Sequence, residues 1–249
     1  MITDTHCHIY KEYYDDIDEI IKKSEEKGVN RFINDACNLE SCYEVLELSK
    51  NHKNMYCVIG LHPSEDLKDI EKVIDFIYKN INNKIVVGIG EIGLDYYWNK
   101  ENKEEQKEVF IKQLNIAHEN NLPVVIHSRE STGDVIEILK KFKLKGVIHC
   151  FNGSIETAKE YIKMGFKLGI NGVVTFKNCN LINVIKEIGV EHLVFETDSP
   201  YLTPVPNRGK KNDPSYTSNI IDFVADNTGV SKEKLIELSN KNIKYIFDI

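Results

Sequence analysis

The sequence has 249 residues, of which 41% are hydrophobic and 29% charged, and its formal net charge is −7. This composition is typical of a soluble globular protein, and the acidic balance argues against a surface that binds nucleic acid over its whole extent. No apolar run approaches the ~18 residues of a membrane span, and no N-terminal segment has the pattern of a signal peptide. Six cysteines without a CxxC pair favour reduced thiols and a cytoplasmic location.

Short β-rich runs recur along the chain and alternate with stretches of helical periodicity. The eight runs cover residues 2–9, 31–36, 55–59, 85–89, 123–126, 146–149, 166–170 and 192–196. The first helical stretch begins near Ile17, spaces its buried positions three and four residues apart, and ends at Gly28. Similar spacings occur within residues 70–77, 110–117, 135–142 and 181–188. Two more helices are predicted to begin at Asp213-Pro214 and at Ser231.

Strand and helix repeated eight times over about 250 residues predict an α/β protein, a (β/α)8 TIM barrel that forms a single domain over residues 1–249. A doubly wound open sheet is the alternative. The position of the polar residues favours the barrel, because they end the β-rich runs and TIM-barrel active sites lie at the C-terminal ends of the strands.

The first run contains Thr5-His6-Cys7-His8, and alternation along a strand places His6 and His8 on one face and Cys7 on the other. Later runs also end in residue types that bind metals, namely Glu91, His127, His149, Glu196 and Asp198. Buried ionised carboxylates need a partner charge or a metal. Several histidines and carboxylates at one rim of the barrel therefore predict a metal centre.

These nitrogen and oxygen ligands exceed the need of one tetrahedral site, so we expect two divalent ions, with Mg, Mn and Zn all open. Glu91 is the candidate bridge between the ions. His6 and His8 would hold one ion with Asp198, and His127 and His149 would hold the other. Asp198 could also act as general base toward the attacking water. The predicted reaction class is metal-assisted hydrolysis.

The other histidines and two cysteines receive structural interpretations. His52 and His192 precede strands and are expected to be structural, and His118 lies in a helix and is expected to be solvated. Cys7 and Cys150 flank candidate ligands but should point to the opposite face of their strands, where they pack as small apolar residues.

Candidate substrate contacts lie in the loops after the strands. Arg129 follows a candidate ligand by two residues and suits a bidentate grip on phosphate, with a structural salt bridge as the alternative. His62 could hydrogen-bond a phosphate oxygen. Arg208 belongs to a basic run that is either a phosphate contact or a solvated surface. Three aromatic residues after Glu91 could stack on bases or pack over the barrel rim, namely Tyr96, Tyr97 and Trp98.

Five motifs in this order resemble the TatD-type deoxyribonucleases of the amidohydrolase-like TIM barrels, namely THCH, GEIGLDYY, IHSRE, HCFNGS and ETDSPYLTPVPNRG. The resemblance covers nearly the whole chain. It implies metal ligands at His6, His8, Glu91, His127, His149 and Asp198, in agreement with the strand ends. It also implies divalent-metal-dependent cleavage of DNA phosphodiesters, often as a 3′→5′ exonuclease. Single-stranded DNA or 3′ ends would be the substrate, and a monomer is expected.

The chain departs from the family pattern in two loops, where many relatives have a histidine in place of Ser64 and of Asn207. Neither position is a candidate ligand, so the changes concern substrate preference rather than hydrolysis. Two other functions stay open. The same barrel could hydrolyse a small amide, lactone or phosphoester, or it could bind metal without catalysis and act as an interaction partner.

Overall fold

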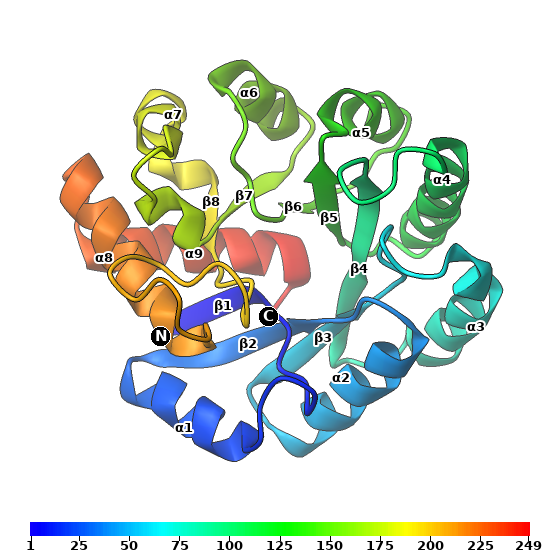
Figure 1. Ribbon diagram of the computed structural model, residues 1–249, viewed down its shortest axis with the longest axis horizontal. Helices are drawn as coiled ribbons and strands as arrows, with labels where there is room; N and C mark the ends of the chain where they lie inside the picture. The colour runs from blue at the N-terminus through cyan, green and yellow to red at the C-terminus, as the bar shows by residue number, and fades with distance from the viewer.

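A computed structural model describes residues 1–249, and its eight parallel strands pair in sequence order, each strand with the next (Figure 1). A parallel bridge between Cys7, at the end of the first strand, and Ser199, in the segment after the last strand, closes the ring. This arrangement is a (β/α)8 barrel, as the sequence predicts. The strands are β1 Ile2–Cys7, β2 Val29–Asp35, β3 Met55–Ile59, β4 Val86–Asp95, β5 Val124–Arg129, β6 Gly146–Ile148, β7 Lys167–Ile170 and β8 Leu193–Phe195.

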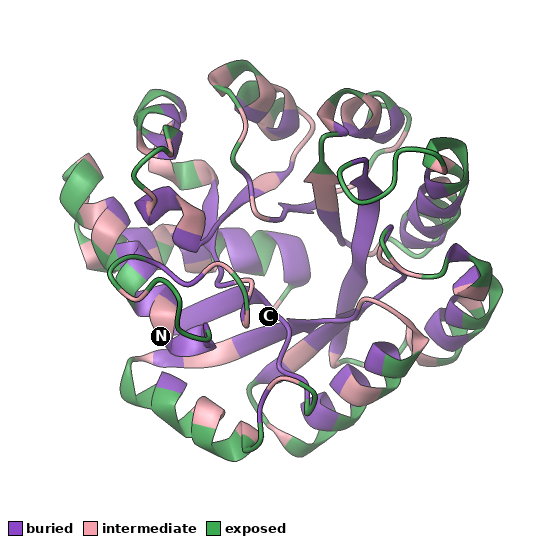
Figure 2. Ribbon diagram, in the orientation of Figure 1, coloured by how far each residue is buried: buried purple, intermediate pink, exposed green.

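Nine α-helices surround or close the barrel, and their inner faces are buried while their outer faces are exposed (Figure 2). They are α1 Ile17–Glu26, α2 Leu39–Asn51, α3 Ile70–Asn80, α4 Lys103–Glu119, α5 Thr132–Leu139, α6 Ile155–Lys163, α7 Leu181–Ile188, α8 Thr217–Thr228 and α9 Lys232–Phe247. Four 3-10 turns accompany them: η1 Leu67–Asp69, η2 Gly172–Thr175, η3 Val190–His192 and η4 Pro214–Tyr216. Every helix is too short or too polar to span a lipid bilayer.

Helices α2 and α6 were not among the helices that apolar spacing predicts, and their buried faces explain why. The buried face of α2 includes Ser41 and Ser49 beside its apolar residues, and α6 buries only Ala158 and Tyr161. Small or polar residues at buried positions weaken the apolar stripe by which a helix is recognised.

The caps that mark helix ends in the sequence are present, with one shift in position. Ser231 accepts a hydrogen bond from the backbone N–H of Lys234 at the start of α9. Gly28 has φ = +82° just beyond the end of α1, a left-handed conformation that glycine adopts without strain. Asp213 caps the 3-10 turn η4 rather than an α-helix, so α8 begins four residues later, at Thr217.

The barrel interior holds an apolar layer that is distinct from the larger core between strands and helices. Six strands contribute one side chain each, and three residues of α9 pack against them; the set is Ile33, Val58, Val87, Val125, Val147, Val194, Ile243, Ile246 and Phe247. Asn242 of α9 also donates to the carbonyl of Leu193, at the start of β8. Helix α9 therefore closes the N-terminal end of the barrel and leaves the C-terminal end open.

Candidate metal centre

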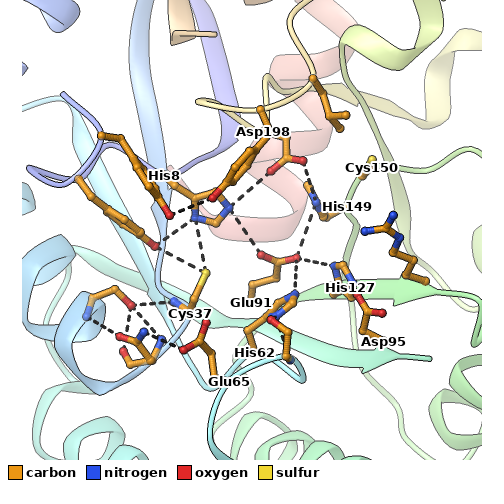
Figure 3. Close-up of a pocket in the computed structure, with 18 of the residues that line it drawn as sticks. His8, Cys37, His62, Glu65, Glu91, Asp95, His127, His149, Cys150 and Asp198 are labelled. Carbon is orange, nitrogen blue, oxygen red and sulfur yellow. Dashed lines mark hydrogen bonds and ion pairs between the residues drawn. The ribbon is translucent and has the colours of Figure 1, made fainter. Parts of the chain in front are cut away.

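Polar side chains lie two residues beyond the apolar layer, at the ends of the strands or just past them. The pairs of positions are Ile33 and Asp35, Val125 and His127, Val147 and His149, and Val194 and Glu196. Successive inward-facing residues lie about 6.6 Å apart along a strand. The C-terminal mouth of the barrel is thus lined by imidazoles and carboxylates, and all six ligands expected from the sequence meet there. Figure 3 shows five of them, namely His8, Glu91, His127, His149 and Asp198.

Four donor atoms converge on the β1 side of this mouth. The Nε2 atoms of His6 and His8 lie 3.2 Å apart. Glu91 Oε2 lies 3.5 Å from the first and 3.7 Å from the second. Asp198 Oδ1 lies 3.7 Å and 3.5 Å from the same two atoms. Ligand atoms about 2.0–2.2 Å from a tetrahedral ion lie roughly 3.3–3.6 Å from one another, so this set fits a divalent cation.

The other carboxylate oxygen of Glu91 faces a second set of imidazoles. Glu91 Oε1 lies 2.9 Å from Nδ1 of His127, 3.5 Å from Nε2 of His62 and 3.7 Å from Nε2 of His149. Figure 3 shows Glu91 between His8 on one side and His62 and His127 on the other. A carboxylate with each oxygen directed at a separate imidazole group suits a ligand shared by two ions.

Three buried carboxylates stand behind the imidazoles. Asp35 Oδ1 lies 3.0 Å from His6 Nδ1, Asp95 Oδ2 lies 2.9 Å from His127 Nε2, and Glu196 Oε1 lies 3.0 Å from His149 Nδ1. Such partners fix the orientation and tautomer of a metal-binding imidazole and raise its basicity. The sequence reasoning noted Glu196 at a strand tip but missed Asp35 and Asp95. Asp35 could have been found, because it follows the inward-facing Ile33 by two residues.

The charges in the mouth compensate one another and shift several pKa values. Burial would raise the pKa of Glu91, but the imidazoles of His62, His149 and His6 hold it well below its ordinary value. Burial would lower the pKa of His6, but the carboxylates of Asp35 and Glu91 outweigh this effect and raise it. Neither carboxylate oxygen of Asp35 makes a well-aligned hydrogen bond, and its nearest partner is His6 Nδ1, 3.0 Å from Oδ1. A buried carboxylate requires positive charge nearby, which a protonated His6 or a metal ion bound to His6 would supply.

Local backbone features bring Glu91, His127 and Asp198 together. Gly93 pairs with His127 in the β4–β5 register, at φ = +153°, and a Cβ atom there would lie 1.9 Å from the carbonyl oxygen of His127. Only glycine permits this approach. The backbone N–H of Asp198 donates to the carbonyl of His6 over 3.0 Å, which fixes the segment after β8 against β1.

The predicted substrate contacts do not all lie in one place. His62 and Arg129 line the cleft above the mouth, a cavity of about 1700 Å³. Arg208 lies over the ring of Phe176 at 3.9 Å and borders a separate shallow depression with Lys177 and Val205. Arg208 thus stays a predicted contact that the fold does not bring into the main cleft.

The aromatic residues after β4 divide into two groups. Tyr96 is buried, and its hydroxyl donates to Asp134 over 2.7 Å, so it packs over the rim and is not free to stack on a base. Tyr97 and Trp98 are 48% and 68% exposed. The Arg129 guanidinium lies 3.9 Å from the ring centroid of Tyr97 and 5.5 Å from that of Trp98.

The remaining histidines and cysteines follow the structural interpretation in part. His52 hydrogen-bonds the carbonyl of Leu48 and lies 3.0 Å from Asp18, and His118 is exposed. Cys7 is buried with its thiol directed at the carbonyl of Ile33. The expectation for Cys150 is wrong: it lies beyond the end of β6, has φ = +49° and lines the cleft.

The two walls of the cleft differ in charge. The wall formed by the β1–α1 segment, α2 and the β3–α3 segment carries Lys11 and five carboxylates, namely Glu12, Glu40, Glu44, Glu47 and Glu65. The wall formed by the end of β5 and the segment after β4 carries Arg129, Trp98 and Glu130, and Glu130 pairs with Lys100. An anionic substrate is repelled by the first wall and attracted by the second.

Comparison with known proteins agrees with this geometry. Residues 3–248 match the family described as TatD related DNase. The chain is 39% identical to the metal-dependent hydrolase YabD of Bacillus subtilis, with all of both chains covered. It is 33% identical to the metal-dependent hydrolase YcfH of Escherichia coli K12, with 100% of this chain and 96% of the relative covered. The crystal structure of YjjV, a TatD homolog from Escherichia coli, is similar with a TM-score of 0.92 at 25% identity, covering 100% of this chain and 98% of that one.

Proposed function

The chain belongs to the TatD family of metal-dependent hydrolases, and on this premise we propose that it cleaves DNA phosphodiester bonds as a 3′→5′ exodeoxyribonuclease. The observation that carries the proposal is the placement of Glu91, whose two oxygens face two imidazole groups at the floor of a long, open cleft. Hydrolysis of phosphodiesters is a reaction for which paired divalent ions are well suited.

In this proposal His6, His8 and Asp198 would hold one ion, His127 and His149 the other, and Glu91 would contact both. His149 Nε2 lies 3.7 Å from Glu91 Oε1 and 3.9 Å from Asp198 Oδ2, so it is within reach of either ion. Divalent ions at these positions supply Lewis-acid stabilisation of the phosphate charge and make water a better nucleophile at neutral pH. His62 Nε2 lies 3.5 Å from Glu91 Oε1, and the side chain is 12% exposed. From this position beside His127 it can donate a hydrogen bond to a phosphate oxygen.

Asp198 is the general base in this proposal. Its side chain is 14% exposed and that of Glu91 is 3% exposed, so Asp198 is the more accessible of the two candidate carboxylate ligands to a water molecule in the cleft. A general base must lie within hydrogen-bond reach of the proton that it removes. The attacking water adds to phosphorus, its proton passes to Asp198, and the 3′-oxygen of the neighbouring nucleotide departs.

A small amide, lactone or phosphoester is the second candidate substrate, and one observation favours it. The carboxylates of the acidic wall disfavour a long polyanion that would run through the whole cleft. An exonuclease avoids this repulsion, because only the end of a DNA strand has to enter the cleft. The rest of the strand can leave along the wall that carries Arg129.

Labelled single-stranded DNA tests the proposal. We expect the protein with Mg²⁺ or Mn²⁺ to shorten 5′-labelled DNA stepwise and to release mononucleotide first from 3′-labelled DNA. Chelator and Asp198→Asn should each stop the reaction, while Tyr78→Leu, a change at an exposed side chain of α3, should not. Intact DNA together with turnover of a lactone or a small phosphodiester would replace this function with the second candidate.

A further inference from the structure

Asp95 joins the metal centre to the exposed segment that follows β4. One carboxylate oxygen, Oδ2, lies 2.9 Å from His127 Nε2. The other, Oδ1, accepts hydrogen bonds from the backbone N–H groups of Tyr97 and Trp98 over 2.9 and 3.0 Å. Asp95 is 1% exposed, so this connection is shielded from water. The β4–β5 pairing and this buried carboxylate together fix the position of Trp98 relative to His127.

Arg129 is held by aromatic contacts and has no anionic partner. Its guanidinium lies over Tyr97 at 3.9 Å, and Tyr97 and Trp98 pack edge to face with 5.0 Å between ring centroids. The neighbouring carboxylate, Glu130, pairs with Lys100 instead. A guanidinium whose face is occupied still presents N–H groups at its edge, and these suit a phosphate.

An exposed indole beside an unpaired guanidinium in one cleft wall matches the two parts of a nucleotide. Bases stack on aromatic side chains whatever their sequence, and phosphates bind arginine. The opposite wall offers Lys11 and the exposed ring of Tyr43, but five carboxylates accompany them. Its net charge is therefore negative, and a phosphate chain that leaves the metal centre is favoured on the side of Arg129.

We propose that Trp98, Tyr97 and Arg129 form a subsite for the nucleotide next to the scissile phosphodiester, with its base on Trp98 and its phosphate on Arg129. Asp95 is the positioning residue that sets this subsite relative to His127. The inference rests on the proposed nuclease function and adds to it the residues that hold the substrate beside the cleaved bond.

The sequence contains one tryptophan and twelve tyrosines, so emission excited at a wavelength that only tryptophan absorbs reports on Trp98 alone. We expect a short oligothymidylate to quench Trp98 emission saturably in the Asp198→Asn protein with Mg²⁺. An abasic strand of equal length should bind roughly tenfold or more weakly and leave the emission nearly unchanged. Equal affinity for both strands, or no quenching by either, would overturn the subsite.

Variants separate the three contributions. Arg129→Met should weaken the binding of both the oligothymidylate and the abasic strand. The bound oligothymidylate should still quench Trp98 emission. Trp98→Ala should raise KM for DNA with kcat unchanged, and Trp98→Phe should restore most of the loss because a phenyl ring still stacks. Asp95→Asn should shift the Trp98 emission spectrum and raise KM for base-bearing DNA more than for abasic DNA. Tyr245→Leu, at an exposed position on α9, is the matched control and should change none of these values.

The outcomes distinguish the subsite from the nuclease function. If the protein degrades DNA but Trp98→Ala leaves KM unchanged, the subsite is wrong and the function stands. If DNA is neither bound nor degraded while a lactone or small phosphodiester is hydrolysed, the function and the subsite both fail.

Discussion

The two ends of the barrel are built on the same strands, but helix α9 closes one of them and the residues that point inward differ. At the N-terminal end the inward layer is apolar, with Val125, Val147 and Val194 packed against Phe247 of α9. Two residues further along the same strands stand His127, His149 and Glu196. One step of strand alternation thus separates a layer that stabilises the fold from a layer that carries the chemistry.

Exchanging the two layers would destabilise the protein, because each layer suits only its own end of the barrel. Apolar burial contributes about 25 cal/mol per Å² and needs no partner, so the closed end can rely on it. Buried imidazoles and carboxylates need opposite charges or a cation, and the open end supplies these through pairs such as His6 with Asp35. Changes at the open end should therefore alter activity, and changes at the closed end should alter stability.

Asp198→Asn should have the largest effect. The amide cannot accept the proton of the attacking water, so DNA hydrolysis should fall by roughly 10²–10⁴-fold or more. Metal content, measured by elemental analysis, should fall only in part because the imidazoles and Glu91 remain. Unfolding in urea should still be cooperative. A variant with near-normal rates would show that Asp198 is not the base.

Phe247→Ala tests the closed end. Removal of a large buried aromatic side chain should lower the free energy of unfolding by about 3–5 kcal/mol. The turnover rate per folded molecule should match that of the unaltered protein, because the metal centre lies at the opposite end. Urea titration and single-temperature kinetics measure the two quantities. A loss of turnover equal to that of Asp198→Asn would mean that the two ends are not independent.

Metal removal tests the open end without a mutation. A cation that binds only the folded protein stabilises it by about 4 kcal/mol when its concentration is 1,000 times Kd. Chelator should lower the urea midpoint accordingly, and the protein should stay folded because Glu91 and the imidazoles neutralise one another. Since distant sites contribute additively, Phe247→Ala should show the same chelator shift in free energy. Midpoints that do not respond to chelator or added Mn²⁺ would contradict a metal centre.

The contrast between the ends also explains how far the sequence could be interpreted. The open end was predictable because His127 and His149 each follow a run of apolar residues, and such an abrupt change of residue type is visible without a structure. The contacts above the mouth were not. Tyr96, Tyr97 and Trp98 are consecutive, yet the first packs inward and the others are exposed, because Asp95 and Asp134 fix the turn of the backbone. Arg208 is similarly drawn away by Phe176, a partner 32 positions earlier in the chain.

His52→Ala should have the smallest effect and sharpens the comparison most directly. His52 has the same imidazole as His6, but it lies at the end of α2, just before β3, on the closed side of the barrel. There it bonds the carbonyl of Leu48 and pairs with the exposed Asp18. Loss of these contacts should lower the free energy of unfolding by about 1 kcal/mol and leave DNA hydrolysis and metal content unchanged. A large loss of activity in this variant would mean that the chemistry does not depend on the end of the barrel at which an imidazole lies.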